Sequence, residues 1–395
     1  MSETDNTVKQ KSDYIFGLDI MRALAILFVL VGHTLEHSQV YEWIKPIGRF
    51  AVIGVEIFFV LSGFLIGTII VRLIEKGRFG TMKDISTFWK RRWMRTIPLY
   101  VIALLAFLNF DYHGKHDLTF HPEYWLFMQN FAWSIPDDFF TISWSLAIEE
   151  HFYLWFPLIF LAAYRFSSKR IAFYLSALFL LAVAIGYRLH LPHMDYNAWN
   201  WESRMVVLAR LDSIMFGVLM AYINFYHADF WNRIRSLSVL WFALIAGLFV
   251  WYYLGAAGIT ERWVQVFGVT LHGLLLALLL PYFNNIRREP SGYIEKAAAW
   301  TSKLAYSLYL GHIICIIFVI KLLSALGIYD FVYPRPYLLY PVLFTAYYSL
   351  ALTTYSYVEK PFLDLRDGVV SGKMVKKFAP FGILFLFLIV DIVLL

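Results

Sequence analysis

Arg22 and His33 are the residues of this sequence whose chemistry and spacing point most directly to a function. Ten residues, ALAILFVLVG, separate them, and none of the ten is polar. In an α-helix, eleven steps of about 100° return to within about 20° of the start, so both side chains project from one face, roughly 16 Å apart. Ionisable side chains inside a membrane helix are costly and indicate function by default. The pair offers a proton acceptor and a cation aligned along one helix.

The composition requires a membrane protein. The chain has 395 residues, of which 60% are hydrophobic and 16% charged, and its mean hydropathy is +0.61. A water-soluble core cannot bury that much apolar surface, so the predicted fold class is all-α, a polytopic membrane protein. The net charge of +6 reflects Lys and Arg held on the cytoplasmic side of the membrane and does not imply nucleic-acid binding. Cys315 is the single cysteine, which excludes an intrachain disulfide.

Eleven apolar runs predict membrane-spanning helices. They cover residues 16–35, 52–74, 93–110, 142–164, 171–189, 205–226, 237–254, 263–283, 304–326, 337–358 and 378–395. Residues 1–13 are polar and predict a cytoplasmic N-terminal tail. Residues 14–362 then form the membrane domain, and residues 363–395 form a cytoplasmic linker and a C-terminal transmembrane helix.

The distribution of positive charge predicts the orientation. With the N-terminus in the cytoplasm, the cytoplasmic segments hold roughly three times as many Lys and Arg residues as the opposite side. This places the C-terminus outside the cytoplasm. Arg22 then lies toward the cytoplasm and His33 in the outer half of the bilayer.

Two motifs near the cytoplasmic side could bind a phosphorylated ligand. In WKRRWMRTIPLY, Arg92, Arg95 and Pro98 recur every three residues, which brings both guanidinium groups near one side of a helix as a fork for phosphate. The alternative is a cluster of positive charge that only marks a helix end. In GVEIFFVLSGFLIG, Ser62 and Gly63 are small enough to let a ligand approach the backbone, or another helix.

Further polar residues interrupt the apolar runs. In SWSLAIEEHFYLWFP, at least one of Glu149 and Glu150 should face a polar interior, where it could orient a histidine or stay protonated. Arg210 and Asp212 of RLDSIMFG form either an ion pair within one helix or contacts to a substrate. His312 of YSLYLGH is either a helix-to-helix hydrogen bond or a catalyst.

Taken together and in order, these motifs resemble acyltransferase family 3, integral-membrane enzymes that acylate sugars and related acceptors of the cell envelope. The Arg22 and His33 spacing is the most specific element, and GVEIFFVLSGFLI, the Arg92 and Arg95 series, WSLAIEEHFY and the closing YSYVEKPF accompany it. The resemblance extends from Gly17 to about Phe362. It implies a ten-helix acyltransferase core, to which the run 378–395 adds an eleventh helix, and a cytoplasmic acyl-coenzyme A donor, usually acetyl-coenzyme A.

The resemblance also implies roles for individual residues. It makes His33 the catalytic base and Arg22 a donor-binding or orienting residue, with Glu149 supporting the catalytic region. The donor-binding residues would be Arg92, Arg95, Ser62 and Gly63. We assign acceptor contacts to Trp144, Tyr153, Arg210 and Asp212. No metal is expected, because the histidines of the loops lack a metal-ligand spacing.

The resemblance therefore implies an O-acetyltransferase of the bacterial inner membrane that modifies an envelope polysaccharide or its lipid-linked precursor. Its partners would be the lipid bilayer and the envelope glycan, and its oligomeric state is not predicted. Three aromatic loops, which begin at Tyr112, His190 and Tyr329, could contact sugar rings or the membrane interface. Transfer of succinyl or another acyl group, and a small-molecule acceptor, stay open. A different class is a proton-coupled transporter, which would use Arg22, His33 and Glu149 as an ion pathway; the absence of an evident internal repeat argues against it.

Overall fold

The computed structural model describes residues 14–36, 45–113, 122–136, 139–251 and 261–369. Apart from one isolated bridge between Ile15 and Arg288, the regular structure of these residues is helical. The all-α fold class is therefore confirmed. The predicted helix at 378–395 lies outside the described residues.

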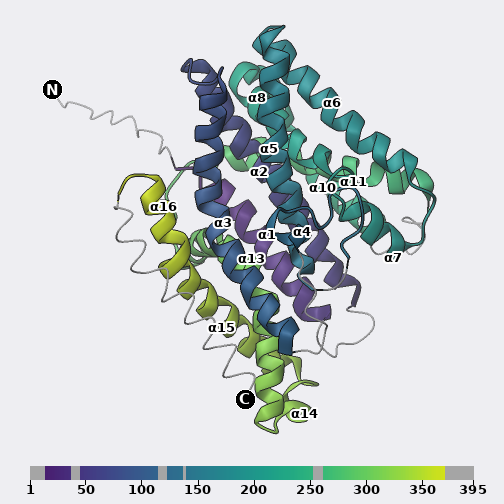
Figure 1. Ribbon diagram of the computed structural model, residues 1–395, viewed down its shortest axis with the longest axis vertical. Helices are drawn as coiled ribbons and strands as arrows, with labels where there is room; N and C mark the ends of the chain where they lie inside the picture. Colours follow the sequence, from purple (N-terminus) through teal and green to yellow (C-terminus); the bar gives the residue numbers. More distant parts are fainter. Residues whose placement is uncertain (1–13, 37–44, 114–121, 137–138, 252–260, 370–395) are drawn as a thin grey trace, which may run out of the picture.

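The helices pack together as a bundle (Figure 1). Their bounds are α1 Phe16–Glu36, α2 Phe50–Glu75, α3 Met82–His113, α4 Pro122–Trp125, α5 Trp144–Arg165, α6 Lys169–His190, α7 Tyr196–Trp199, α8 Leu211–Tyr226, α9 Ala228–Ser236, α10 Ser238–Phe249, α11 Arg262–Ala277, α12 Leu280–Asn284, α13 Tyr293–Ala325, α14 Tyr329–Val332, α15 Pro336–Thr354 and α16 Lys360–Arg366. Short 3₁₀ turns cover Lys45–Arg49 and Thr141–Ser143, and π-helical turns cover Asn200–Arg204 and Tyr355–Glu359.

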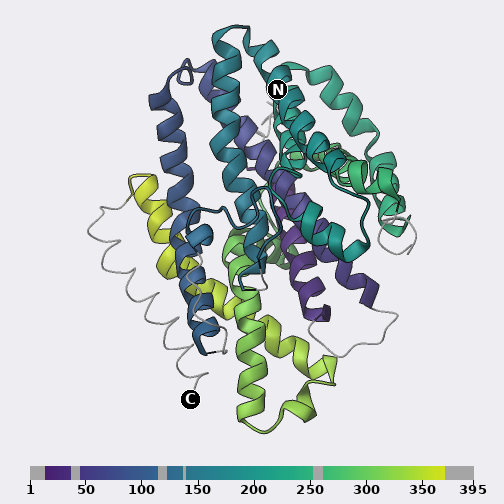
Figure 2. The same cartoon turned by 45° about the vertical axis from the view of Figure 1, so that its right-hand side comes forward.

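Helices α1 and α2 lie in the middle of the bundle, with α15 and α16 on one flank and α10 and α11 on the other (Figures 1 and 2). Glycines allow α2 to approach α8 closely. A Cβ atom added at Gly63 would lie 1.9 Å from the carbonyl oxygen of Ile214, and one added at Gly217 would lie 2.1 Å from that of Val60. Small residues permit such backbone contact between membrane helices. Gly63 thus has a packing role between α2 and α8.

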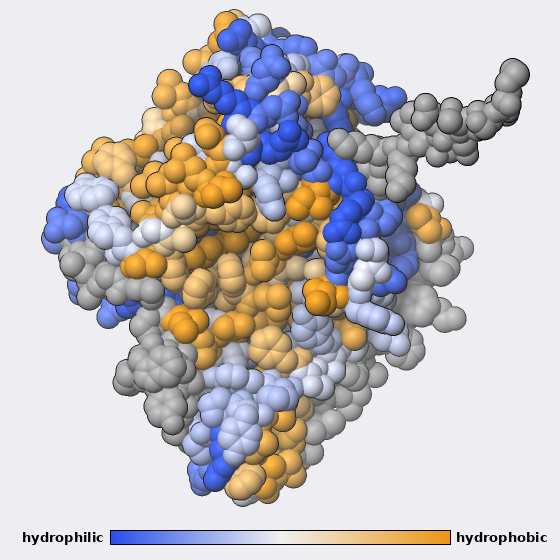
Figure 3. Space-filling model, turned by 180° about the vertical axis from the view of Figure 1, so that it is seen from behind, coloured by the Kyte–Doolittle hydropathy of each residue, from blue (hydrophilic) through white to orange (hydrophobic). Residues whose placement is uncertain are grey.

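The outer surface matches a bilayer environment. Six described helices are long and apolar enough to cross a membrane, and the pair α9 and α10, bent by 60°, would make a seventh. One face of the molecule carries a broad apolar region across its middle, with hydrophilic residues concentrated toward the top (Figure 3). The structure thus has the features of a multi-pass membrane protein, while the exact number of crossings stays a prediction.

Helix α8 is shorter than the sequence pattern predicted. The apolar run starts at residue 205, but the helix begins at Leu211. The backbone before it is irregular, and its amides bond elsewhere: Val207 N–H donates to the Asn130 carbonyl at 2.8 Å and Leu208 N–H to that of Phe131 at 3.1 Å. Non-helical backbone at membrane depth is tolerated where protein surrounds it and satisfies its hydrogen bonds.

Candidate active site

Arg22 and His33 line two different cavities at the two ends of α1. We name the first the arginine cavity; its polar lining includes Arg22, Ser62, Arg92, Arg95, Glu149 and Tyr306. We name the second the histidine cavity; its polar and aromatic lining includes His33, Arg49, Trp144, Tyr196, Trp201 and Arg204. Helix α1 therefore contributes one ionisable side chain to each of the two cavities.

Val55 and Tyr309 line both cavities, so both cavities border these two side chains. The Tyr309 hydroxyl donates to the Ile142 carbonyl at 2.9 Å and lies 2.6 Å from the Ser145 hydroxyl. These hydrogen bonds fix the phenol at the boundary. A group that contacts Tyr309 from either cavity would therefore lie close to the other cavity.

Glu149 is held inside the arginine cavity by three side chains. The Ser62 hydroxyl donates to it at 3.1 Å, the Tyr153 hydroxyl donates at 2.7 Å, and a guanidinium nitrogen of Arg92 lies 3.7 Å away. Arg92 also donates to the Tyr153 hydroxyl at 2.6 Å and lies 4.2 Å from the centre of its ring. Tyr153 therefore positions both the arginine and the carboxylate from behind the cavity wall.

The other two cations of the arginine cavity differ in their partners. Arg22 donates to Asp19 at 3.1 Å and to the Ser302 hydroxyl at 2.9 Å. Just before α1, burial and the neighbouring Asp19 carboxylate raise the pKa of Tyr14, so its neutral hydroxyl donates to Asp19. Arg95 makes no hydrogen bond or ion pair with the described residues, although it lines the cavity. The cavity therefore presents cationic charge that a phosphate could neutralise.

His33 forms a hydrogen-bonded pair with His312. The Nδ1 atom of His33 lies 2.9 Å from Nε2 of His312. The Nδ1 atom of His312 faces two acceptors, the carbonyls of Tyr309 at 2.7 Å and Leu308 at 3.2 Å. A nitrogen that faces carbonyl oxygens must carry the proton, so the Nε2 atom of a neutral His312 is an acceptor. His33 then donates from Nδ1, and its own Nε2 carries the lone pair that a base requires.

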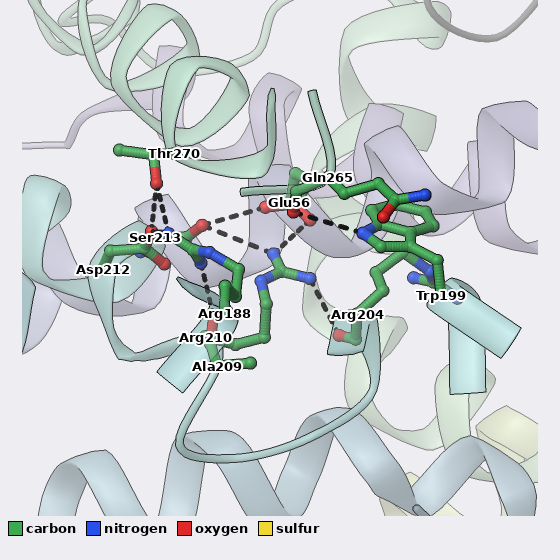
Figure 4. Close-up of polar contacts among 10 residues, drawn as sticks. All are labelled: Glu56, Arg188, Trp199, Arg204, Ala209, Arg210, Asp212, Ser213, Gln265 and Thr270. Carbon is green, nitrogen blue, oxygen red and sulfur yellow. Dashed lines mark hydrogen bonds and ion pairs between the residues drawn. The ribbon is translucent and has the colours of Figure 1, made fainter. Parts of the chain in front are cut away.

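Close to the histidine cavity, four charged side chains form a buried network (Figure 4). Arg210 pairs with Glu56 of α2, and Arg188 of α6 donates to Asp212 at 2.8 Å. All four are at most 1% exposed. The expectation of an ion pair within one helix is wrong, because the partners of Arg210 and Asp212 come from other helices. Neither residue is among those that line the two cavities.

A family model described as "Acyltransferase domain", that of acyltransferase family 3, matches residues 15–358. The chain belongs to this family. The match covers α1 through α15, so both cavities lie inside it.

Named relatives of this family member include O-acetyltransferase OatA of Staphylococcus aureus strains NCTC 8325 / PS 47 and COL. Each is 27% identical over 337 residues, which is 78% of this chain and 51% of the relative. The chain thus spans about half the length of the curated relatives it matches. No solved structure is significantly similar to it.

The structure places most of the predicted site residues in the lining of one or the other cavity. Those that line the arginine cavity are Arg22, Ser62, Arg92, Arg95 and Glu149. Those that line the histidine cavity are His33 and Trp144. Gly63 instead contacts α8, and Glu149 lies with the arginines, whereas His312 is the side chain that hydrogen bonds to His33. The roles of these residues in acyl transfer stay predictions.

Three polar residues of the histidine cavity have no predicted role. Arg49, Asn200 and Arg204 line it and were not singled out. The signal that came closest was the aromatic loop that begins at His190, whose Tyr196 and Trp201 line the cavity. No sequence motif identifies Arg204. It lies just after that loop and looks like an ordinary charged loop residue.

Proposed function

We propose that this protein is a membrane O-acyltransferase that transfers an acetyl group from acetyl-coenzyme A to a hydroxyl of an envelope polysaccharide or its lipid-linked precursor. The observation that carries the proposal is the pair of cavities, one rich in arginine and one lined by His33, that share Val55 and Tyr309 as lining residues. A donor in one and an acceptor in the other would react at the shared wall. Membership of acyltransferase family 3 and the printed name of the OatA relatives support this reading.

The arginine cavity suits the donor. Arg22, Arg92 and Arg95 can bind the phosphates of coenzyme A, since guanidinium groups form paired, charge-assisted hydrogen bonds with phosphate oxygens. Apolar side chains, including Phe58 and Leu61, line the rest of the cavity and suit the uncharged arm that carries the thioester. The thioester would then lie near Tyr309, at the boundary with the histidine cavity.

His33 suits the role of general base. Its Nε2 would take the proton from the acceptor hydroxyl while the oxygen attacks the carbonyl carbon of the thioester. His312 accepts the hydrogen bond from Nδ1–H and so favours the required tautomer of His33. As the C–S bond breaks, the proton on His33 can pass to the departing thiolate, which restores the neutral imidazole. The products are an O-ester and coenzyme A.

We further propose that the protein lies in the bacterial inner membrane with its N-terminus in the cytoplasm. The excess of Lys and Arg on the predicted cytoplasmic segments supports this orientation. The arginine cavity would then take acetyl-coenzyme A from the cytoplasm, and the histidine cavity would receive an acceptor on the other side. Reporter fusions at Lys169 and Trp199 test the orientation: cytoplasmic signal at the first and external signal at the second are expected, and the reverse result would overturn it.

The function is tested with purified protein in lipid nanodiscs. The protein is incubated with radiolabelled acetyl-coenzyme A and an envelope glycan fraction, and alkali-labile ester on the glycan is counted. We expect ester formation that requires both substrates. Proton flux through reconstituted vesicles without donor, together with no ester on any envelope fraction, would establish the transporter class instead.

A further inference from the structure

Arg204 is a buried cation in the wall of the histidine cavity. It ends the π-helical turn Asn200–Arg204, and only 6% of its surface is exposed. Its Nε donates to the Asn200 side-chain oxygen at 2.5 Å, and its guanidinium carbon lies 4.7 Å from the centre of the Trp144 ring. Its Nη1 is buried and has no hydrogen-bond partner among the described residues. One edge of the guanidinium is therefore fixed while a donor on the other stays unsatisfied.

The backbone that carries Arg204 is held rigidly from outside the cavity. Arg210 donates to the Arg204 carbonyl at 3.0 Å, as Figure 4 shows, and Asn130 donates to the carbonyl of Met205 at 2.5 Å. Arg210 is itself anchored by Glu56. The position of the guanidinium is thus fixed in advance of any ligand, which lowers the entropy that binding must offset.

The cavity carries more positive than negative charge. Arg49 also lines it, 5.4 Å from the centre of the Tyr196 ring, while Glu36 is the carboxylate in the lining. Arg204 forms no ion pair with a described carboxylate, in contrast to Arg188 and Arg210, which are at most 1% exposed. A buried charge without a counter-charge is destabilising, so a site that keeps one is suited to a ligand that supplies it.

We propose that the histidine cavity binds an anionic group of the acceptor, a carboxylate or a phosphate, through Arg204. That the anionic ligand is the acceptor rests on the acyltransferase function proposed above. The guanidinium can donate a charge-assisted hydrogen bond to either anion, and the Asn200 side chain and the Trp144 ring hold it in place. The acceptor class is then an acidic sugar or a phosphorylated, lipid-linked sugar, and not a neutral glycan.

The test compares three probes that share one sugar ring: methyl glucuronoside, glucose 1-phosphate and the neutral methyl glucoside. Dissociation constants are measured by thermal stabilisation of the purified protein at constant ionic strength. We expect at least one anionic probe to bind about tenfold more tightly than the neutral one, as a charge-assisted hydrogen bond allows. The tighter of the two anions tells whether a carboxylate or a phosphate is preferred.

Substitutions show which cavity is responsible for the preference for an anionic probe. Arg204→Gln should abolish it, and Arg204→Lys should keep part of it because the charge remains. Arg95→Gln is the matched control, since glucose 1-phosphate could enter the arginine cavity instead; the preference should survive there. Equal binding of all three probes by the wild-type protein, or a preference lost only in Arg95→Gln, overturns the proposal.

A parallel assay of acetyl transfer separates this proposal from the function on which it rests. An anion preference that depends on Arg204 in a protein that transfers no acetyl group would remove the acyltransferase function and keep the anion site. In the other outcome, Arg204→Gln lowers acetyl transfer equally for anionic and neutral acceptors. This result would keep the acyltransferase function and overturn the anion site, because Arg204 would then act on the donor carbonyl.

Discussion

Two groups of arginines, all buried except the half-buried Arg95, occupy neighbouring parts of this molecule and differ in what they face. Arg188 and Arg210 each contact a carboxylate from another helix, and neither lines a cavity. Arg95 and Arg204 each line a cavity, and neither forms an ion pair with a described carboxylate. The same residue type thus holds helices together in one place and offers charge to a ligand in the other.

The contact with a carboxylate is what separates the two groups. Removing one partner of a buried pair leaves an uncompensated charge and destabilises the fold, whereas removing a charge that has no partner relieves a cost. Stability and ligand binding should therefore respond in opposite ways in the two groups, which gives the comparison consequences that can be measured.

The largest effect is expected from Asp212→Asn. This variant leaves the buried guanidinium of Arg188 without its carboxylate, so we expect a loss of about 3 to 5 kcal/mol of stability and little folded protein. Thermal inactivation and yield after detergent extraction measure it. Lys169→Gln, which removes an exposed ion pair with Glu75, is the control and should behave as wild type. A well-folded Asp212→Asn with a raised acceptor KM would instead make Asp212 a substrate contact.

Arg95→Gln should fold at least as well as wild type and lose donor affinity. A charge-assisted contact to phosphate contributes about 1.5 to 3 kcal/mol, so the KM for acetyl-coenzyme A should rise roughly tenfold to hundredfold. Initial rates at varied donor concentration and saturating acceptor measure it. An unchanged donor KM would remove Arg95 from the donor site.

A smaller loss, about tenfold in kcat, is expected from His312→Phe, because His33 keeps its lone pair but loses the acceptor that favours its tautomer. The KM values for both substrates should stay the same, and the pH at which the rate is half-maximal should move. His272→Phe, at a buried histidine of α11, is the matched control. Identical losses in both variants would reduce His312 to a packing residue.

Tyr153→Phe should have the mildest effect. It deletes the hydroxyl that joins Arg92 to Glu149 but keeps the ring beneath the guanidinium. One hydrogen bond contributes about 0.5 to 1.5 kcal/mol, so the donor KM should rise roughly threefold to tenfold with kcat nearly constant. A fall in kcat alone would place Tyr153 in the chemical step.

The sequence was sufficient for the features that depend on local spacing. Apolar runs predicted the helices, including α1, which carries both Arg22 and His33. The three-residue step from Arg92 to Arg95 likewise placed both in one cavity. Each of these inferences needs only the geometry of a single helix.

Features that depend on contact between distant segments could not be predicted in this way. His312 lies 279 residues from His33, and its proton is placed by carbonyls of its own helix that become relevant only once α13 packs on α1. Arg210 and Asp212 are two residues apart, a spacing at which helical side chains do not face each other, so their partners had to come from elsewhere. Arg204 can be recognised only from the structure, because its distinguishing features are its place in the histidine cavity and the lack of an ion pair with a described carboxylate.

The most direct test of the account is to measure acetyl-coenzyme A binding and acetyl transfer together in His33→Ala. Transfer should fall by about a hundredfold or more, as the loss of a general base requires, while the donor binds with wild-type affinity in the arginine cavity. A variant that binds donor normally and still transfers acetyl groups at the wild-type rate would contradict it, because His33 would then not be the base of the reaction.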